Sequence, residues 1–423
     1  MGLKNQKSSQ TGGMSSLADK LKALGVKTGT AGIQAPSRGN PGSYSIERVV
    51  DGRFVSTRLG DTFISESHYP LDHQHGEVPI LFSEGLDTLA LWAGDGGLTG
   101  MKTADFVFLD TETSGLSGGT GTYAFMVGAG RFEAGGFHLE QFFMRDPGEE
   151  AAMLEALTDF LAPASVMVTY NGKAFDAPLL KTRYRLHDMP VPFNDMIHLD
   201  LLPLARRLWR DRLPSRTLKY IEENVLGAPR SSEEVPGYEI PYLYFDYLRS
   251  GDARPLMGVF YHNNMDIVAL AAMLNHMNHM LVEPLHESIE HGLDRIALAK
   301  LFEDLGKWDQ AAQLYERGLQ ESLPEADFGQ AVRRLSILQR RRGDLEAALA
   351  LWEKAANDGY IYAHIELAKH HEHRQRDPVT AMRWTLLARE LVQKDESLPV
   401  YMRKHWLDEV NHRLERLEKK ARS

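Results

Sequence analysis

The stretch DFVFLDTETSGLSGGTGTYAFMVGAGRF, residues 105–132, contains two dense apolar runs separated by a polar segment rich in glycine. A third run, GFHLEQFFM at 136–144, begins directly after a Gly-Gly pair. Short runs of aromatic and β-branched residues bounded by glycine are typical of strands joined by turns. The stretch therefore predicts three strands in an antiparallel meander.

Helical and strand-like patterns alternate after this meander. Residues 149–162 have helical spacing, VMVTYN at 166–171 is strand-like, and FDAPLLKTRYRLH at 175–187 is again helical. Such alternation favours an α/β domain with a mixed sheet flanked by helices. We predict that this domain covers residues 104–283.

The residues before this domain differ from it in composition. Residues 1–44 are rich in Ser, Gly, Lys and Gln and have an excess of basic side chains, which predicts a disordered basic arm. Residues 45–103 contain short apolar runs broken by Asp-Gly, Gly-Asp and Pro, which predicts a β-rich N-terminal extension packed on the main domain.

An internal repeat follows the domain. LFEDLGKWDQAAQLYERGLQ at 301–320 aligns with LQRRRGDLEAALALWEKAAN at 338–357, and a weaker third copy begins at Asp377. The matched pairs in the first two copies are Gly306 and Gly343, Ala311 and Ala348, and Tyr315 and Trp352. Small residues at fixed spacing let paired helices approach closely, and this pattern resembles tetratricopeptide repeats. We predict an all-α array of helical hairpins over residues 290–423.

Composition limits the functions that the chain can have. It has 423 residues, 43% of them hydrophobic, and contains no cysteine, so a metal ion must be held by oxygen or imidazole. A formal net charge of −10 argues against a protein that coats nucleic acid non-specifically. We find no apolar run of the length of a membrane span and no apolar signal segment, and we expect a soluble, cytoplasmic protein without membrane contact.

Two acidic residues, Asp110 and Glu112, lie at the end of the first strand of the meander. Residues two apart on a strand project from the same face, so the two carboxylates can meet there. Such a pair at the end of an apolar strand repels itself unless a cation intervenes. Taken alone, however, an Asp-x-Glu pair is also common on protein surfaces.

Two more aspartates occupy comparable positions. Asp176 follows an apolar strand and opens a helix, where capping of the helix is the simple alternative. Asp266 lies in YHNNMDIVALAAML, a helical segment in which it stands outside the apolar face. His262 precedes Asp266 by four residues and therefore lies one turn away on the same side.

The order of these motifs along the chain is more specific than any one motif alone. The series Asp-x-Glu, Asn-Gly-Lys-x-Phe-Asp and His-Asn-x-x-Asp over residues 104–275 resembles the three exonuclease motifs of the DEDD nucleases. More narrowly, four runs look like the YprB-type ribonuclease-H-like domain. These runs are DTETSGLSGGTGTYAF, VTYNGKAFDAPLL, HLDLLPLARRLW and YHNNMDIVAL.

The resemblance implies a metal site. By position, Asp110, Asp176 and Asp266 would bind metal, while Glu112 would bind metal or orient the attacking water. Four carboxylates around two divalent ions can hold an attacking water and a leaving oxygen on opposite sides of a phosphodiester. Hard oxygen ligands favour Mg²⁺ or Mn²⁺ as the cofactor.

The general base has two candidates. DEDD exonucleases usually have His five residues, or Tyr four residues, before the last Asp, whereas here Tyr261 is at minus five and His262 at minus four. We favour His262, because its unperturbed pKa of about 6.5 suits proton removal near neutrality.

Further residues are candidates for contact with nucleic acid. Asn171 and Lys173 precede Asp176 in one loop and could address a phosphate or a base. A basic helical segment with Trp209 offers charge for phosphates and an aromatic ring for stacking, although a solvated helix face has the same appearance. Its principal candidates are Arg206, Arg207 and Arg210. The glycines at 115, 118, 119 and 121 would let the backbone pass close to a phosphate, or form a simple hairpin loop.

The sequence favours a metal-dependent nuclease that hydrolyses phosphodiester bonds of DNA or RNA, as a 3′–5′ exonuclease with a two-metal-ion mechanism. One alternative is a nucleic-acid-binding module with weak or no turnover. Another is a scaffold that binds a protein partner through the repeats. The residues do not distinguish DNA from RNA, the end that is attacked, or the oligomeric state.

Overall fold

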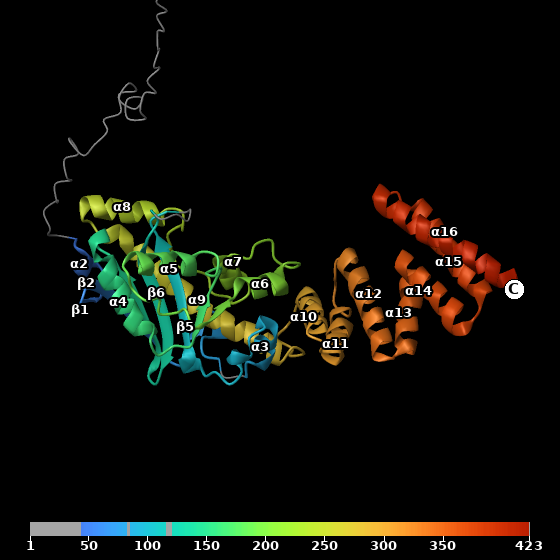
Figure 1. Cartoon of the computed structure of the whole chain (residues 1–423), viewed down its shortest axis with the longest axis horizontal. Helices are drawn as coiled ribbons and strands as arrows, with labels where there is room; N and C mark the ends of the chain where they lie inside the picture. Colours follow the sequence, from blue (N-terminus) through green and yellow to red (C-terminus); the bar gives the residue numbers. More distant parts are fainter. Residues whose placement is uncertain (1–43, 83–84, 116–120, 423) are drawn as a thin grey trace, which may run out of the picture.

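The computed structural model of the protein describes residues 44–82, 85–115 and 121–422 (Figure 1). The arm predicted for residues 1–44 lies outside the described residues, apart from Tyr44. Gly118 and Gly119 of the predicted loop also lie outside them, whereas Gly115 and Gly121 are described.

One mixed sheet organises the first part of the chain. Its order is β1-β2-β7-β6-β5-β8-β9, antiparallel from β1 to β5 and parallel from β5 to β9. The strands are β1 (Arg53–Thr57), β2 (Gly60–Tyr69), β5 (Phe106–Thr113), β6 (Ala124–Glu133), β7 (Gly136–Phe143), β8 (Val166–Thr169) and β9 (Ile197–Asp200). The predicted meander corresponds to β5, β6 and β7, and the prediction of a mixed sheet flanked by helices is confirmed.

The N-terminal extension contributes to this same sheet. β1 and β2 form a hairpin, and β2 pairs along β7, so the extension lengthens the sheet by two strands. Its remaining elements are α2 (Ile46–Val49), α3 (Asp87–Ala93) and the small pair β3 (Gln74–His75) and β4 (Val78–Pro79).

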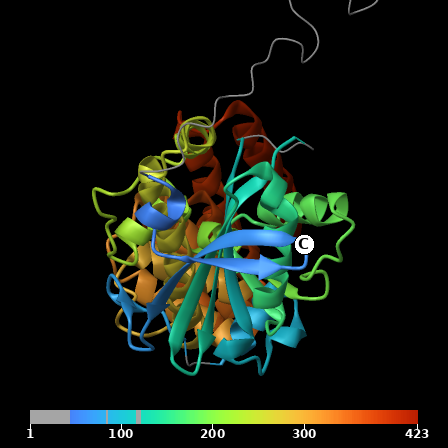
Figure 2. The same ribbon diagram turned by 90° about the vertical axis from the view of Figure 1, so that its left-hand side faces the viewer.

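Helices cover both faces of the sheet (Figures 1 and 2). On one face, Val107 and Leu109 of β5 pack in a core with α4 (Glu150–Leu161), α5 (Asp176–Leu186) and α8 (Ile240–Ser250). On the other face, Phe106 and Phe108 pack with α6 (Leu202–Trp209), α7 (Leu218–Asn224) and the long α9 (Met257–Val282). Alternation along β5 thus decides which side chains face α9.

Two glycines of β6 let α9 lie directly on the sheet. A Cβ added at Gly128 would come within 2.2 Å of Asn263 Oδ1, and one at Gly130 within 2.7 Å of Ile267 Cγ2. Gly128 is the register partner of Asp110. The glycines in GAGRF therefore place α9 in close contact with the strand that carries the acidic pair.

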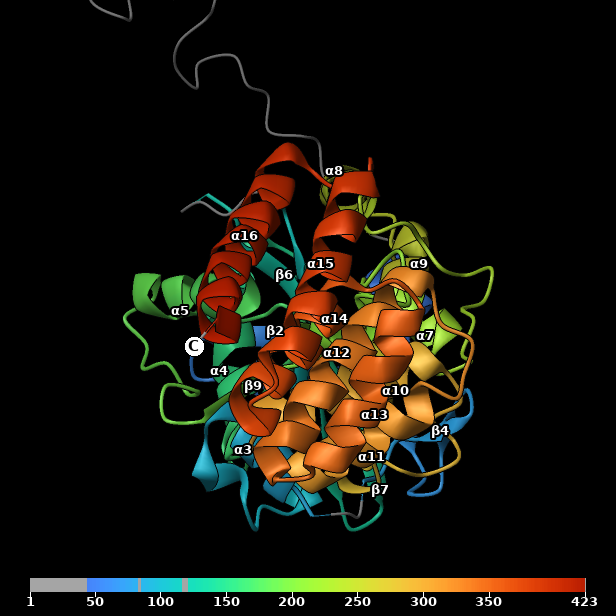
Figure 3. The same cartoon turned by 90° about the vertical axis from the view of Figure 1, so that its right-hand side faces the viewer.

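An all-helical region follows the sheet and extends away from it, as predicted (Figures 1 and 3). Its helices are α10 (Gly292–Asp304), α11 (Trp308–Gly318), α12 (Glu325–Arg342), α13 (Leu345–Asn357), α14 (Ile361–His370), α15 (Pro378–Lys394) and α16 (Val400–Arg422), with a π-helical turn η5 (His371–Gln375) after α14. No helix of the described ranges is long and apolar enough to cross a membrane.

The positions matched in the internal repeat have equivalent environments in the structure. Gly306 and Gly343 both have left-handed backbones, with φ of 74° and 88°, at the turn between two helices. Ala311 and Ala348 are both fully buried. Asp377 caps α15 through Val379 N and Thr380 N, as Asp344 caps α13 through Ala347 N.

The first helical hairpin shares the core of the sheet region. One hydrophobic cluster runs without interruption from Phe108 through α9 to Leu301 of α10 and Leu314 of α11. Ion pairs cross the same junction, including Arg207–Asp304 and Arg212–Asp294. The same cluster continues through Ala331, Leu335 and Leu338 of α12 (Glu325–Arg342). We propose that α10, α11 and this face of α12 belong physically with the sheet region, so that the independent part of the predicted 290–423 array begins after them.

Candidate active site

The acidic pair lies on the face of β5 that α9 covers. Phe106 and Phe108 pack under α9, and period-two alternation places Asp110 and Glu112 on that same side. The strand loses its apolar character at Asp110, where the Asn263 amide Nδ2 donates a hydrogen bond to Asp110 Oδ2 at 3.1 Å. Both acidic side chains are thereby directed into a space between β5 and α9.

α9 brings two more predicted residues to the pair. His262 Nε2 lies 3.3 Å from Asp266 Oδ2 and 3.9 Å from Glu112 Oε1. Ligand atoms of Glu112, His262 and Asp266 all lie within 4.8 Å of one another. Glu112 Oε1 is buried and has no hydrogen-bond partner in the described part of the chain. An orphaned carboxylate oxygen beside these ligand atoms fits a divalent cation.

Asp176 reaches the site from the other side of β5. The hydroxyl of Thr111, which alternates to the face opposite Asp110, donates a hydrogen bond to Asp176 Oδ1. Asp176 is the first residue of α5, yet its charge contributes to raising the pKa of both Asp110 and Glu112. The four predicted carboxylates therefore belong to one electrostatic cluster.

The carboxylates differ in the direction in which the site shifts their pKa. Burial and the charges of the other three carboxylates raise the pKa of Asp110 well above its usual range. Burial is also the main reason that the pKa of Glu112 rises to about 7. Burial opposes ionisation of Asp266 as well, but His262 and Arg230 outweigh it and lower its pKa. Asp266 is thus the stable anion of the cluster.

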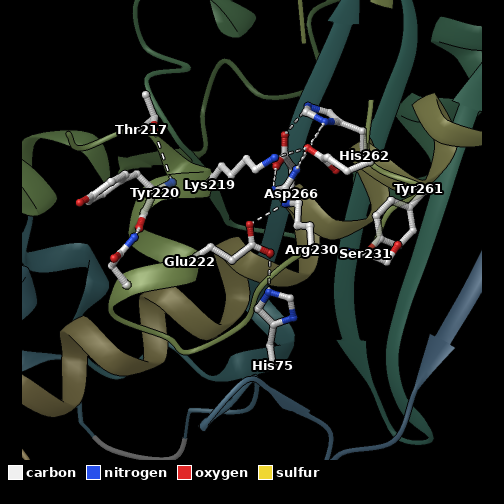
Figure 4. A network of polar contacts seen from close by, with 12 residues as sticks. His75, Thr217, Lys219, Tyr220, Glu222, Arg230, Ser231, Tyr261, His262 and Asp266 are labelled. Atoms are coloured by element: carbon white, nitrogen blue, oxygen red, sulfur yellow. Dashed lines mark hydrogen bonds and ion pairs between the residues drawn. The ribbon is translucent and has the colours of Figure 1, made fainter. Parts of the chain in front are cut away.

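Arg230 and Glu234, from the segment between α7 and α8, complete the site. Figure 4 shows Arg230 between Asp266 and Glu222. The Arg230 side chain is 2% exposed and pairs with Asp266, with Glu234 Oε1 at 3.0 Å and with Glu222 Oε2 at 2.7 Å. Glu222, fully buried on α7, also contacts His75 Nε2 at 2.7 Å. A buried guanidinium shared by three carboxylates holds this segment against α9.

His262 is oriented by the same segment. Its Nδ1 lies 2.9 Å from Glu234 Oε1, so Nδ1–H donates to the carboxylate and Nε2 faces Glu112 and Asp266. Burial alone lowers the pKa of His262, but the hydrogen bonds to Asp266 and Glu234 and the nearby negative charges raise it to about 11. At neutral pH the imidazole therefore carries a proton on Nε2.

Tyr261, the other candidate base, points elsewhere. Its hydroxyl accepts a hydrogen bond from Ser231 N at 3.0 Å, and Figure 4 shows the ring directed away from the carboxylates. Of the two candidates, His262 is the one that faces the acidic cluster.

Asp200 shapes the loop that leads into Asp176. It accepts hydrogen bonds from the backbone N–H of Asn171 at 2.7 Å and of Lys173 at 3.1 Å. Asn171 adopts a left-handed backbone with φ of 65°. Phe175, immediately before Asp176, is 60% exposed. The loop therefore presents an aromatic ring and the Lys173 side chain at the edge of the site.

The three candidate arginines of the basic segment have different environments in the structure. Arg206 lines a pocket of about 410 Å³ together with Tyr170, Asn171 and Arg216. Arg207 instead pairs with Asp304 of α10, and Arg210 lies 3.5 Å from Asp211. The prediction that Trp209 stacks with a base is wrong, because Trp209 is fully buried on the core side of α6.

Comparison with known proteins agrees with this geometry. Residues 107–278 match the RNase_H superfamily, whose fold is typical of nucleases that use divalent metals. The chain is 36% identical over 326 residues to protein YprB of Bacillus subtilis (strain 168), a match that spans 74% of this chain and 77% of YprB. Residues 107–278 therefore form a domain of the RNase_H superfamily, and the chain belongs to the family of YprB.

A solved structure gives a much weaker match. The family B DNA polymerase of Pyrobaculum calidifontis shares 14% identity with this chain, with a TM-score of 0.32, over 47% of this chain and 28% of the polymerase. A likeness of this size carries no argument about function.

Proposed function

We propose that this protein is a metal-dependent nuclease that hydrolyses phosphodiester bonds of DNA or RNA. The observation that carries the proposal is that Glu112, His262 and Asp266 bring ligand atoms together between β5 and α9, with Glu112 Oε1 buried and unpartnered among the described residues. The charges of Glu112 and Asp266 also act on Asp110 of the same strand face. Membership of the RNase_H superfamily supports it. We propose a 3′–5′ exonuclease with two ions as the specific form.

The residues fit a hard cation such as Mg²⁺ or Mn²⁺. Bound there, the cofactor would polarise the phosphate and lower the pKa of a water molecule. Asp110, Asp176 and Asp266 would hold it through carboxylate oxygens, and Glu112 would hold it or accept a hydrogen bond from the water. The raised pKa values of Asp110 and Glu112 mean that these groups give up protons when they become ligands.

His262 is the proposed proton acceptor once a cation is bound. In the metal-free structure its Nε2 already carries a proton, because burial is outweighed by the nearby carboxylates, which raise its pKa. A cation held by Glu112 and Asp266 would offset their negative charge, so that Nε2 could release this proton and then accept one from the water. Glu234 fixes the ring through Nδ1, and Nε2 is the atom that would hold the proton. Asp266 and Glu112 stabilise the imidazolium that results, because both lie on the Nε2 side. Tyr261 has no contact of this kind in the described structure.

A direct assay tests the proposal. Purified protein is incubated with end-labelled single- and double-stranded DNA and RNA in Mn²⁺, in Mg²⁺ or in chelator. We expect a ladder of shortened products from one end that depends on the metal. Internal cuts would replace the exonuclease with an endonuclease, and intact substrate under every condition would refute nuclease activity.

One observation favours a second candidate, a nucleic-acid-binding module with weak turnover. Arg230 already pairs with Asp266 in the described structure, so the guanidinium supplies part of the positive charge that a metal ion would otherwise supply. Tight binding of oligonucleotide without cleavage in the same assay would support this alternative.

The pocket beside Asn171 is proposed to receive a nucleotide next to the scissile one. Arg206 and Arg216 supply positive charge there, and Arg216 Nε is buried without a hydrogen-bond partner in the described ranges. We expect Arg206→Gln to weaken oligonucleotide binding by about 3- to 10-fold at low salt, since one phosphate contact is lost. Fluorescence anisotropy in chelator measures it. Arg210→Gln is the matched control, and an equal loss in both variants would exclude a local contact at Arg206.

Metal binding is expected to release protons. Burial is the main cause that raises the pKa of Glu112 to about 7, so Glu112 holds a proton near neutrality that a ligand must lose, and the raised pKa of Asp110 acts in the same direction. Affinity for Mn²⁺ should therefore rise from pH 6 to pH 8, by up to about tenfold per pH unit for each proton released. Calorimetric titration in two buffers of different ionisation enthalpy counts the protons. Heats that do not depend on the buffer would contradict the assignment.

A further inference from the structure

A second basic pocket lies in the helical region, on a different part of the chain from the acidic cluster. It has a volume of about 470 Å³. Five elements contribute to its walls, namely α12, α13, α14, η5 and α16. The helices of the array pack side by side (Figure 3), and residues from several of them line the pocket, so the pocket depends on their packing and not on one loop.

The walls are rich in positive charge. The basic side chains that line the pocket are Arg340, Lys369, Arg374, Arg413 and Arg416. One acid, Glu366, lines it with them and pairs with Arg340 at 2.8 Å and Lys369 at 2.9 Å. Glu372, behind the wall, pairs with Arg413 and Arg416. Arg374 is exposed and makes no ion pair with any residue that the structure describes, so a positive charge remains available in the pocket.

Three buried donors point to a ligand with several acceptor atoms. Trp352 Nε1, His370 Nδ1 and Arg413 Nε are buried and have no hydrogen-bond partner within the described chain. Their side chains belong to residues that are 2%, 7% and 7% exposed. The Gln375 amide donates to His370 Nε2 at 3.2 Å, which leaves the proton of the neutral ring on Nδ1. The residues that line the pocket therefore offer more N–H donors than acceptors, which suits an anion.

We propose that this pocket binds a phosphate group of a nucleic-acid strand, at a distance from the reaction centre. The choice of an anion rests on the pocket itself. The choice of a nucleic acid rests on the proposed function, because the same chain has a nuclease-type fold and a second cationic pocket at Arg206. A chain of net charge −10 that concentrates cations in such pockets is suited to hold one strand at several points.

A binding experiment with the full-length chain in chelator tests this proposal. Two labelled single strands are compared by anisotropy, one of about 30 nucleotides and one of about 6 nucleotides. The short strand can occupy the reaction centre but is too short to extend into the repeats. We expect Arg374→Gln to weaken binding of the long strand by about 3- to 10-fold. The slope of log affinity against log salt concentration should also become smaller by about one. Binding of the short strand should not change.

Arg376→Gln is the matched control, since Arg376 lies two residues away, is exposed and does not line the pocket. An equal loss of affinity in both variants, or none in Arg374→Gln, would overturn the proposal. A labelled oligoglutamate peptide is tested in the same way. If Arg374→Gln weakened binding of this peptide and left binding of the long strand unchanged, the pocket would belong to an acidic protein partner, and the proposal would be overturned. Absence of cleavage with Mn²⁺ would refute nuclease activity while leaving this binding result standing.

Discussion

Replacing Asp110 by Asn is expected to abolish metal-dependent cleavage and to raise the stability of the metal-free protein. Asn keeps the shape of the side chain but removes the anion that a divalent cation requires, a loss of several kcal/mol in the transition state, or roughly 100- to 1000-fold in rate. Folding raises the pKa of Asp110, so its ionised form opposes folding above the unfolded pKa of about 3.9.

This gain in stability has a defined pH dependence. At pH 7.5 the Asp110→Asn variant should have a higher free energy of unfolding than wild type, because Asn removes the cost of burying this carboxylate beside the other three. The difference should vanish below about pH 4, where Asp110 is protonated in both folded and unfolded chains. Urea unfolding in chelator at the two pH values measures it. Retained cleavage, or a loss of stability at pH 7.5, would remove Asp110 from the proposed site.

Asp266→Asn serves as the contrasting variant. Its activity should fall as far, but its stability should decrease, because Arg230 and His262 lower the pKa of Asp266 in the folded protein. The sequence predicts the same role, metal binding, for both aspartates, but the structure gives them different partners.

The second large effect is expected from Arg230→Gln. The buried guanidinium serves Asp266, Glu222 and Glu234 at once, so its removal leaves three carboxylates without their shared cation. We expect a loss of about 3–5 kcal/mol in the metal-free protein, the usual cost of breaking a buried ion pair. Added Mn²⁺ should raise the melting temperature of this variant more than that of wild type, since the ion replaces part of the missing charge.

Arg207→Gln is the control for this experiment. Arg207 also pairs with an aspartate, Asp304, but the Asp304 side chain is 57% exposed, and an exposed pair contributes about 0–1 kcal/mol. If Arg230→Gln melted together with wild type in chelator, the guanidinium would have no role in holding the segment. If Mn²⁺ raised the melting temperatures of Arg230→Gln and wild type equally, Arg230 and the ion would neutralise different carboxylates.

The sequence was sufficient for the elements that depend on local pattern. The meander, α4, α5 and α9 follow from the spacing of apolar residues, and the repeat register follows from Gly306, Gly343 and the matched alanines. The four carboxylates could be named because each stands at the end of a strand or on a helix in a recognisable motif. The family resemblance supplied their order, and the comparisons confirm the family.

The residues that escaped prediction act across long separations in the chain. Arg230 and Glu234 lie in a segment without periodicity, and nothing local shows that a guanidinium there enters the acidic cluster. Thr111 was passed over because it alternates to the opposite face, although it contacts Asp176. The sequence did not predict that Trp209 is buried, because apolar and basic residues are mixed along α6 and do not show which side of the helix faces the core.

The continuous core between the sheet and the first helical hairpin has one further consequence. A junction packed with apolar side chains does not act as a free hinge, so α10 and α11 keep a fixed position relative to the acidic cluster and to the pocket at Arg206. If the protein digests a strand from one end and the distal pocket holds that strand, as proposed, digestion is expected to slow once the remaining strand no longer spans from the acidic cluster to the distal pocket.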